Sequence, residues 1–190
     1  MVERANEDVI YDKNVIDFVT VGVEFCAMLE SDEPMSRDVW IDKMVKILPL
    51  LYLKASLLPQ TFSLNEEMQE TFVKEEDYVR VQHVVSTIMA EEDIYLDVFV
   101  EEMKYSERPI SSMVSENIAD IYQDVRNFIS VYQYELTDQM RDAIYVCKSN
   151  FETYWGQKLV NVMRPLHALR YDKDSDYDND NNDLDFETWD

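Results

Sequence analysis

The sequence is poorest in glycine, with only Gly22 and Gly156 in 190 residues. Dinucleotide loops, P-loops and nucleophile elbows each need several glycines at fixed spacing, because the backbone must approach phosphate closely or adopt a positive φ. Hairpin-rich β folds also depend on glycine in their tight turns. The scarcity of glycine therefore excludes these phosphate-binding loops and nucleophile elbows and argues against hairpin-rich β folds. It favours long helices with short polar connections.

Cysteine and histidine are almost as scarce. Cys26 and Cys147 lie in apolar helical patterns without a CxxC motif or a Cys/His cluster, which excludes a zinc site and a disulfide framework. The Glu-x-x-His motif of di-iron bundles is also missing, because the residues three before His83 and His167 are arginines. On a helical wheel both histidines fall away from the apolar face, which predicts surface side chains rather than catalytic bases.

Basic residues and long apolar runs are missing too. The chain has 17 basic against 40 acidic residues, a net charge of −23. Direct contact with nucleic acid or with a membrane surface needs a basic face, so the charge argues against both. No run approaches the ~18 apolar residues of a membrane span, and the first residues are polar and acidic instead of signal-like. With the unpaired cysteines, this predicts a soluble, cytoplasmic protein.

Apolar residues nevertheless make up 46 % of the chain, and they recur at helical spacing. The pattern predicts an all-α fold, a single-domain bundle of about five to seven helices. Residues 37–58, which follow the expected cap Ser36, are apolar nearly all round and are therefore expected at the buried centre, kinked at Pro49. Pro165 predicts a bend near residues 161–165. The expected helices cover residues 14–31, 37–58, 75–89, 92–105, 113–133 and, with Thr137 as N-cap, 137–170.

The composition changes at the end of the last expected helix. Residues 172–190 hold nine acids and one base, with Leu184, Phe186 and Trp189 scattered among them. Such a segment cannot bury enough apolar surface to fold by itself. We therefore expect a helical domain over residues 1–170 and a disordered acidic tail over residues 171–190.

Three strings have the order of a known family. They are LPLLYLKASLLP at residues 48–59, YLDVFVEEMKYS at 95–106 and WGQKLVN at 155–161. The chain resembles a family of uncharacterised bacterial proteins, seen mostly in Bacteroidetes, that is defined as domain of unknown function 5063. The resemblance covers about residues 9–170. It implies a cytoplasmic bacterial protein of about this length and no particular activity, ligand or catalytic residue.

Two triplets of acids recur at a spacing of four residues. On a helix each triplet would form one stripe of carboxylates, the arrangement with which all-α nucleotide pyrophosphohydrolases hold Mg²⁺. A wheel at ~100° per residue turns both stripes away from the apolar side. We therefore expect solvated faces and no metal site at Asp93, Asp97 and Glu101 or at Glu116, Asp120 and Asp124.

Two charges fall on apolar faces instead. Lys158 and Glu102 both lie inside apolar arcs of their expected helices, and an unpaired buried charge costs several kcal/mol. We expect them within reach of each other or of Lys54, the only charge in the apolar stretch 47–58. One interpretation is a structural ion pair or snorkelling lysines. The other is a pocket for a small anion or polar metabolite, lined by Lys54, Glu102, Lys158 and Asn161, with Tyr52 and Trp155 as walls.

The sequence predicts no catalytic residue, cofactor or metal site. Our first hypothesis is a non-enzymatic, cytoplasmic interaction or regulatory protein, whose protein partner would contact the acidic surface or Phe186 and Trp189 of the tail. A second is a Mg²⁺-dependent enzyme similar to all-α nucleotide pyrophosphohydrolases, with carboxylates facing each other across a cleft. A third is a DNA mimic that occupies a basic groove of a nucleic-acid-binding protein.

Overall fold

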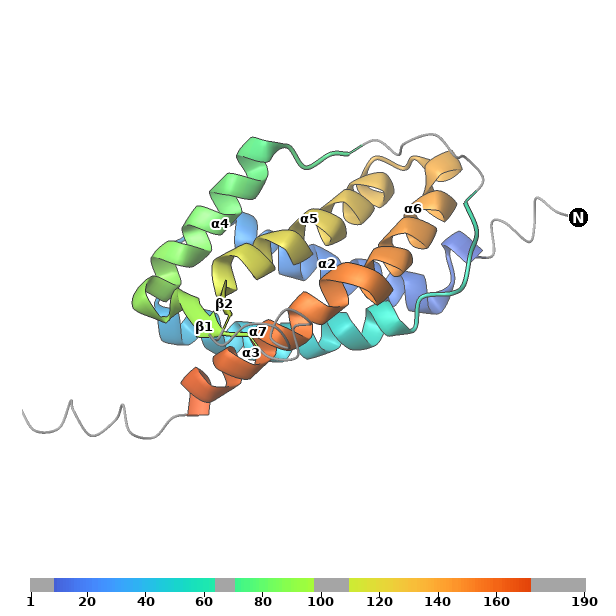
Figure 1. The fold of residues 1–190 in the computed structure, drawn as a ribbon. Helices are drawn as coiled ribbons and strands as arrows, with labels where there is room; N and C mark the ends of the chain where they lie inside the picture. Colours follow the sequence, from blue (N-terminus) through green and yellow to red (C-terminus); the bar gives the residue numbers. More distant parts are fainter. Residues whose placement is uncertain (1–8, 64–70, 98–109, 172–190) are drawn as a thin grey trace, which may run out of the picture.

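The computed structural model describes residues 9–63, 71–97 and 110–171. In this part the chain forms an all-α bundle, as predicted, with a small two-stranded sheet at one side (Figure 1). The expected tail lies outside the described residues. The helices are α2 (Lys13–Glu30), α3 (Arg37–Ser56), α4 (Glu75–Met89), α5 (Val114–Gln133), α6 (Thr137–Asn150) and α7 (Gly156–Tyr171), and the strands are β1 (Ile94–Leu96) and β2 (Ser111–Met113).

The local sequence explains where the first helices begin. Asp12 caps α2, because its side chain accepts a hydrogen bond from the backbone N–H of Asn14 at 2.8 Å. Helix α3 begins after Ser36, as expected, and continues through Pro49. Helix α4 covers the residues predicted for it, and the three acids in its first turn suit the positive end of the helix dipole.

Helix α5, and not α3, is the centre of the bundle. It packs against α2, α4, α6 and α7, and Figure 1 shows it in the middle of the molecule. Its buried side chains include Ile118, Ile121, Val125 and Ile129. Helix α3 packs mainly against α2 and α7 and leaves one side at the surface. The expectation that residues 37–58 form the buried centre was therefore wrong.

The prediction of a helix over residues 92–105 was also wrong for residues 92–97, which the structure describes. Helix α4 ends where Ala90 adopts a φ of 52°, a conformation that a helix cannot continue through. A 3₁₀ turn over Ala90–Asp93 follows, and β1 then pairs antiparallel with β2, with Ile94 opposite Met113. Residues 98–105 of the expected helix lie outside the described residues.

Helices α6 and α7 are joined by a π-helical turn over Phe151–Trp155. The backbone N–H of Gly156 donates to the carbonyl oxygen of Phe151, and a Cβ on Gly156 would clash with that oxygen. Any other residue here would force the backbone to shift. The departure from α-helical geometry comes earlier than the bend expected at residues 161–165, and α7 continues through Pro165. The N-cap of α6 is Leu136, with Thr137 as the first helical residue.

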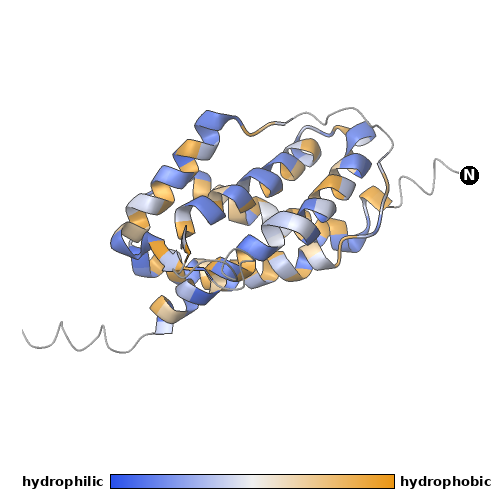
Figure 2. Cartoon of the chain, viewed as in Figure 1, coloured by the Kyte–Doolittle hydropathy of each residue, from blue (hydrophilic) through white to orange (hydrophobic). Residues whose placement is uncertain are grey.

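The other glycine allows α2 to approach α5. A Cβ on Gly22 would lie 2.9 Å from Ile129 Cδ1 and 3.2 Å from Val125 Cγ1. The apolar core includes fully buried Trp40 and Trp155, and hydrophobic and hydrophilic residues alternate around the helices (Figure 2). Within the described ranges, none of the helices is long and apolar enough to cross a membrane.

Candidate functional site

An ion pair joins α7 to α5. The ammonium Nζ of Lys158 lies 2.7 Å from Asp120 Oδ2 and donates to Asn117 Oδ1 at 3.3 Å. It also lies 4.9 Å from the centre of the Tyr154 ring, which is a cation–π distance. Burial by itself lowers the pKa of Lys158, but the hydrogen bond and the charge of Asp120 outweigh it, so the pKa is raised. The prediction that Lys158 has a partner is confirmed, and Asp120 is that partner.

The second acidic triplet does not face solvent as a whole. Asp120 is 7 % exposed, and its second oxygen, Oδ1, accepts a hydrogen bond from the Tyr78 hydroxyl on α4 at 3.0 Å. Asp124 accepts from Asn150 Nδ2 at 2.6 Å, and burial raises its pKa. Glu116 is exposed. The wheel was right for Glu116 and wrong for Asp120, because α4 and α7 cover that flank of α5.

The described acids of the first triplet support local structure. Asp93 is buried and accepts hydrogen bonds from the backbone N–H and the hydroxyl of Ser115, both at 2.7 Å. It thereby satisfies a backbone donor in the first turn of α5. Asp97 accepts from Asn161 Nδ2 at 3.0 Å and from Ser112 Oγ at 2.8 Å. The solvated stripe was a wrong expectation for Asp93, since this residue does not lie on the helix that the wheel assumed.

These contacts form one polar network, which we call the Lys158 network. Across residues 9–63, 71–97 and 110–171, no group of three or more His, Cys, Asp or Glu side chains is arranged to hold a metal ion. Asn117 connects the ion pair to β1 by donating from Nδ2 to the Tyr95 hydroxyl at 2.6 Å. Tyr95 also has a side-chain hydrogen bond with Ser112, which joins Asp97 and Asn161 to the same network. The network thus fixes α4, β1, α5 and α7 relative to one another by hydrogen bonds and charge pairing. Its members are Tyr78, Tyr95, Asp97, Ser112, Asn117, Asp120, Tyr154, Lys158 and Asn161.

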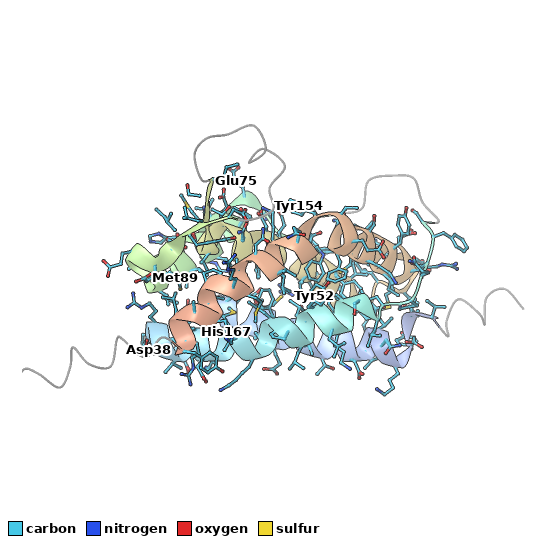
Figure 3. The ribbon with its side chains drawn as sticks, turned by 60° about the horizontal axis from the view of Figure 1, so that its bottom comes forward. Asp38, Tyr52, Glu75, Met89, Tyr154 and His167 are labelled. Carbon is cyan, nitrogen blue, oxygen red and sulfur yellow. The ribbon has the colours of Figure 1, made fainter. Side chains whose placement is uncertain are left out.

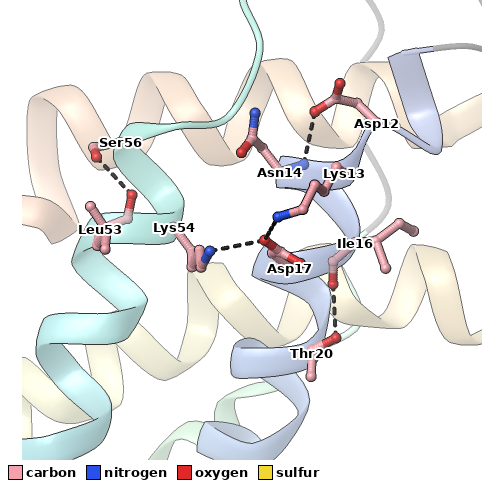
Figure 4. Close-up of polar contacts among 9 residues, drawn as sticks. All are labelled: Asp12, Lys13, Asn14, Ile16, Asp17, Thr20, Leu53, Lys54 and Ser56. Carbon is pink, nitrogen blue, oxygen red and sulfur yellow. Dashed lines mark hydrogen bonds and ion pairs between the residues drawn. The ribbon is translucent and has the colours of Figure 1, made fainter.

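The residues predicted to line one pocket are distributed over several places. Lys158 and Asn161 belong to the Lys158 network. Lys54 instead pairs with Asp17 on α2, 2.9 Å away (Figure 4). Trp155 is fully buried and donates from Nε1 to the Cys147 carbonyl at 3.2 Å. The exposed Tyr52 packs edge-on against the Phe151 ring, 5.0 Å between ring centres.

Two of the acids singled out in the sequence, Glu101 and Glu102, lie outside the described residues. Contact between Glu102 and Lys158 therefore stays a prediction. Both histidines are described, and His83 and His167 are exposed, as predicted. The His167 ring packs on Tyr171, with ring centres 4.7 Å apart.

A polar hollow of about 490 Å³ lies between α2, α4 and α5. Two arginines line it, but Arg126 Nε is already 2.8 Å from Glu30 Oε1. Three acids line the same hollow, so acidic residues outnumber basic ones and the charge does not favour an anion. The charged lining residues are Glu30, Asp32, Asp77, Arg80 and Arg126.

Among the described helices, α3 carries the longest row of exposed apolar side chains on one side. Leu50 and Leu53 on α3 and Leu57 directly after it follow each other at spacings of three and four residues and are 49 %, 50 % and 46 % exposed. Val39 is 48 % exposed and lies about three turns before Leu50, with two lysines between them. At ~100° per residue all of these positions fall in one narrow arc opposite the buried side of the helix. Figure 3 brings this side of the molecule forward. We call this surface the α3 stripe; it consists of Val39, Lys43, Lys46, Leu50, Leu53 and Leu57.

The α3 stripe lies on a helix with an excess of basic residues in an acidic molecule. Helix α3 contains four basic and two acidic residues, and the adjoining α7 contains no acid, with Arg164 and Arg170 besides Lys158, which pairs with Asp120 on α5. The other described helices are neutral or acidic. Sequence reasoning missed this surface because it counted the leucines as core, although the two lysines at the same wheel positions were a usable signal.

The comparisons with known proteins identify relatives without a known activity. No protein of curated function matches the chain. The crystal structure of protein BF1032 from Bacteroides fragilis, a structural genomics target, is 47 % identical in sequence and superimposes with a TM-score of 0.75. The match covers 86 % of this chain and 96 % of that chain. Residues 9–172 match the family model of domain of unknown function 5063 (DUF5063), and the chain therefore belongs to this family.

Proposed function

We propose that this chain is a non-enzymatic, cytoplasmic interaction protein that binds an acidic segment of a protein partner on the α3 stripe. The observation that carries the proposal is the combination of three half-exposed leucines with two lysines on one helix face: Lys43, and Lys46, whose ammonium group also pairs with Asp42 one turn before it. Single exposed apolar residues are ordinary on protein surfaces, but a continuous apolar row marks a contact surface.

The chemistry of the α3 stripe defines the partner segment. Leucines at spacings of three and four offer anchor points to a segment that lies along the helix. Lysines between and beside them favour Asp and Glu in the segment and disfavour basic residues. The matching segment therefore carries several acids and leucine or aromatic side chains. Burying the exposed half of each leucine contributes about 1 kcal/mol, or about 3 kcal/mol for the row.

The cytoplasmic part of the proposal is supported by the thiols. Cys26 and Cys147 are free and buried, which fits a reducing compartment in which disulfides are rare. Burial raises the pKa of both thiols. Neither is suited to catalysis, because the reactive form of a cysteine is the thiolate.

The test is photo-cross-linking from the α3 stripe of the full chain. A photo-reactive amino acid replaces the exposed Val39, so that the lysines and leucines of the stripe are kept. The protein is mixed with a Bacteroides fragilis lysate, and the cross-linked segment is mapped by mass spectrometry. We expect a segment of another protein, and not residues 172–190 of this chain, that carries several acids with leucine or aromatic residues. Cross-linking should be lost in the variant Leu50→Ser/Leu53→Ser and kept in Val79→Ser, a matched control 50 % exposed on α4. Capture of basic segments, or capture that the leucine substitutions leave unchanged, would contradict the proposal.

A further inference from the structure

We propose that the chain's own acidic tail, residues 172–190, occupies the α3 stripe and competes there with the partner segment. This inference rests on the proposed function, because it assigns to the tail the same surface and the same chemistry. The tail holds nine acids and one base, and it carries Leu184, Phe186 and Trp189. It therefore has the composition that the α3 stripe selects.

Charge favours this surface over the rest of the described molecule. The nine acids and one base of the tail give it a net charge of −8. Among the described helices, α3 and α7 are the two with more basic than acidic residues. Helices α2, α4 and α5 each carry an excess of acids and repel the tail. Charges within a Debye length of about 10 Å interact at moderate salt, so the tail is attracted to the α3 and α7 side.

The end of α7 lies next to the first half of α3. Arg170, one residue before the end of α7, is held by Asp42 on α3, with Arg170 Nε 2.9 Å from Asp42 Oδ1. The tail follows directly after Tyr171. Figure 3 shows α7 running beside α3, with His167 labelled in the last part of α7 and Asp38 in the first turn of α3. A chain that leaves α7 there can run along α3 from its first turns toward Leu57.

The tail is also long enough. From Asp42 to Leu53 the helix advances about 16 Å at 1.5 Å per residue. Leu184 follows Tyr171 by thirteen positions, which corresponds to about 43 Å of extended chain at ~3.3 Å per residue. The apolar side chains of the tail therefore reach the leucine row with slack. Tethering of this kind gives an effective concentration of about millimolar, so even a weak contact is well occupied.

The first experiment observes Trp189 in the full chain. Trp40 and Trp155 are 1 % and 0 % exposed, so subtracting the spectrum of Trp189→Phe isolates the emission of Trp189. We expect blue-shifted emission and at least twofold slower acrylamide quenching than for a free peptide of residues 172–190. The variant Lys43→Glu/Lys46→Glu should abolish both effects, and Arg80→Glu on α4 should retain them. Emission and quenching equal to those of the free peptide would overturn the inference.

The second experiment separates this inference from the proposed function. A labelled peptide of residues 172–190 is titrated into the wild-type chain and into Phe186→Ser/Trp189→Ser, whose own tail has lost its aromatic side chains. We expect the variant to bind the peptide at least tenfold more tightly than the wild type. Equal binding to both would overturn tail occupation and leave the proposed function standing. Binding to neither would overturn both, because the α3 stripe would then not accept segments of this chemistry.

Discussion

Breaking the ion pair between Lys158 and Asp120 should destabilise the protein by amounts that depend on which partner remains. The side chains of Lys158 and Asp120 are 26 % and 10 % exposed. Lys158→Met leaves the more deeply buried carboxylate without its cation, at a cost of about 3 kcal/mol. Asp120→Asn keeps an acceptor for the Tyr78 hydroxyl and leaves a lysine with some access to water, at a cost of about 1.5 kcal/mol.

The double variant Asp120→Asn/Lys158→Met removes both charges, so we expect it to lose only about 1.5 kcal/mol, chiefly in hydrogen bonds. The two single losses then exceed the double loss by about 3 kcal/mol, which is the coupling between the residues. Urea unfolding of the four proteins at pH 7, with similar m-values, measures it. The exposed pair Lys46 and Asp42, 67 % and 31 % exposed, is the control and should couple by less than about 0.5 kcal/mol. Additive single losses at Lys158 and Asp120 would refute the reasoning.

Three further predictions concern the glycines, a buried carboxyl and the thiols. Gly156→Ala should cost about 3 kcal/mol in urea unfolding because its Cβ would meet backbone, whereas Gly22→Ala meets the movable tip of a side chain and should cost about 1 kcal/mol. Burial raises the pKa of Asp124, so the folded protein binds a proton on this carboxyl more readily than the unfolded chain does, and the ionised carboxylate costs stability at pH 7. Asp124→Asn should therefore raise the free energy of unfolding at pH 7. This gain in stability should vanish below about pH 4, where the carboxyl is protonated in both states. An unchanged pH dependence would contradict this. Burial also raises the pKa of the Cys26 and Cys147 thiols, so both should react with a thiol reagent only after unfolding, and rapid labelling of the folded protein would show that the core opens.

Helical periodicity and helix-boundary residues were enough to predict most of the fold. The predicted helix 75–89 coincides with α4, and the predicted helix 113–133 begins one residue before α5. The turn after α4 could not be predicted in the same way, because Ala90 is not a residue type that signals a positive φ. The helix expected after it was therefore wrong where the structure describes it.

The candidate site could be predicted only in part, because a helical wheel shows one helix without its neighbours. The wheel correctly indicated that Lys158 needs a partner. It placed Asp120 at the surface because it could not show that α5 is covered on several sides. For α3 the error was the reverse. Apolar residues all round a helix are typical of a buried centre, but they also occur where a helix packs on one side and offers a contact surface on the other, as Leu50 and Leu53 do here.

The central claim is that the α3 stripe binds acidic segments with apolar side chains, and peptide affinity tests it most directly. The labelled peptide of residues 172–190 is titrated into Phe186→Ser/Trp189→Ser with and without the added changes Leu50→Ser/Leu53→Ser. We predict an affinity about thirtyfold lower without the two leucines, which corresponds to about 2 kcal/mol of lost apolar contact, and no loss with Val79→Ser. The same affinity with and without Leu50 and Leu53 would contradict the account.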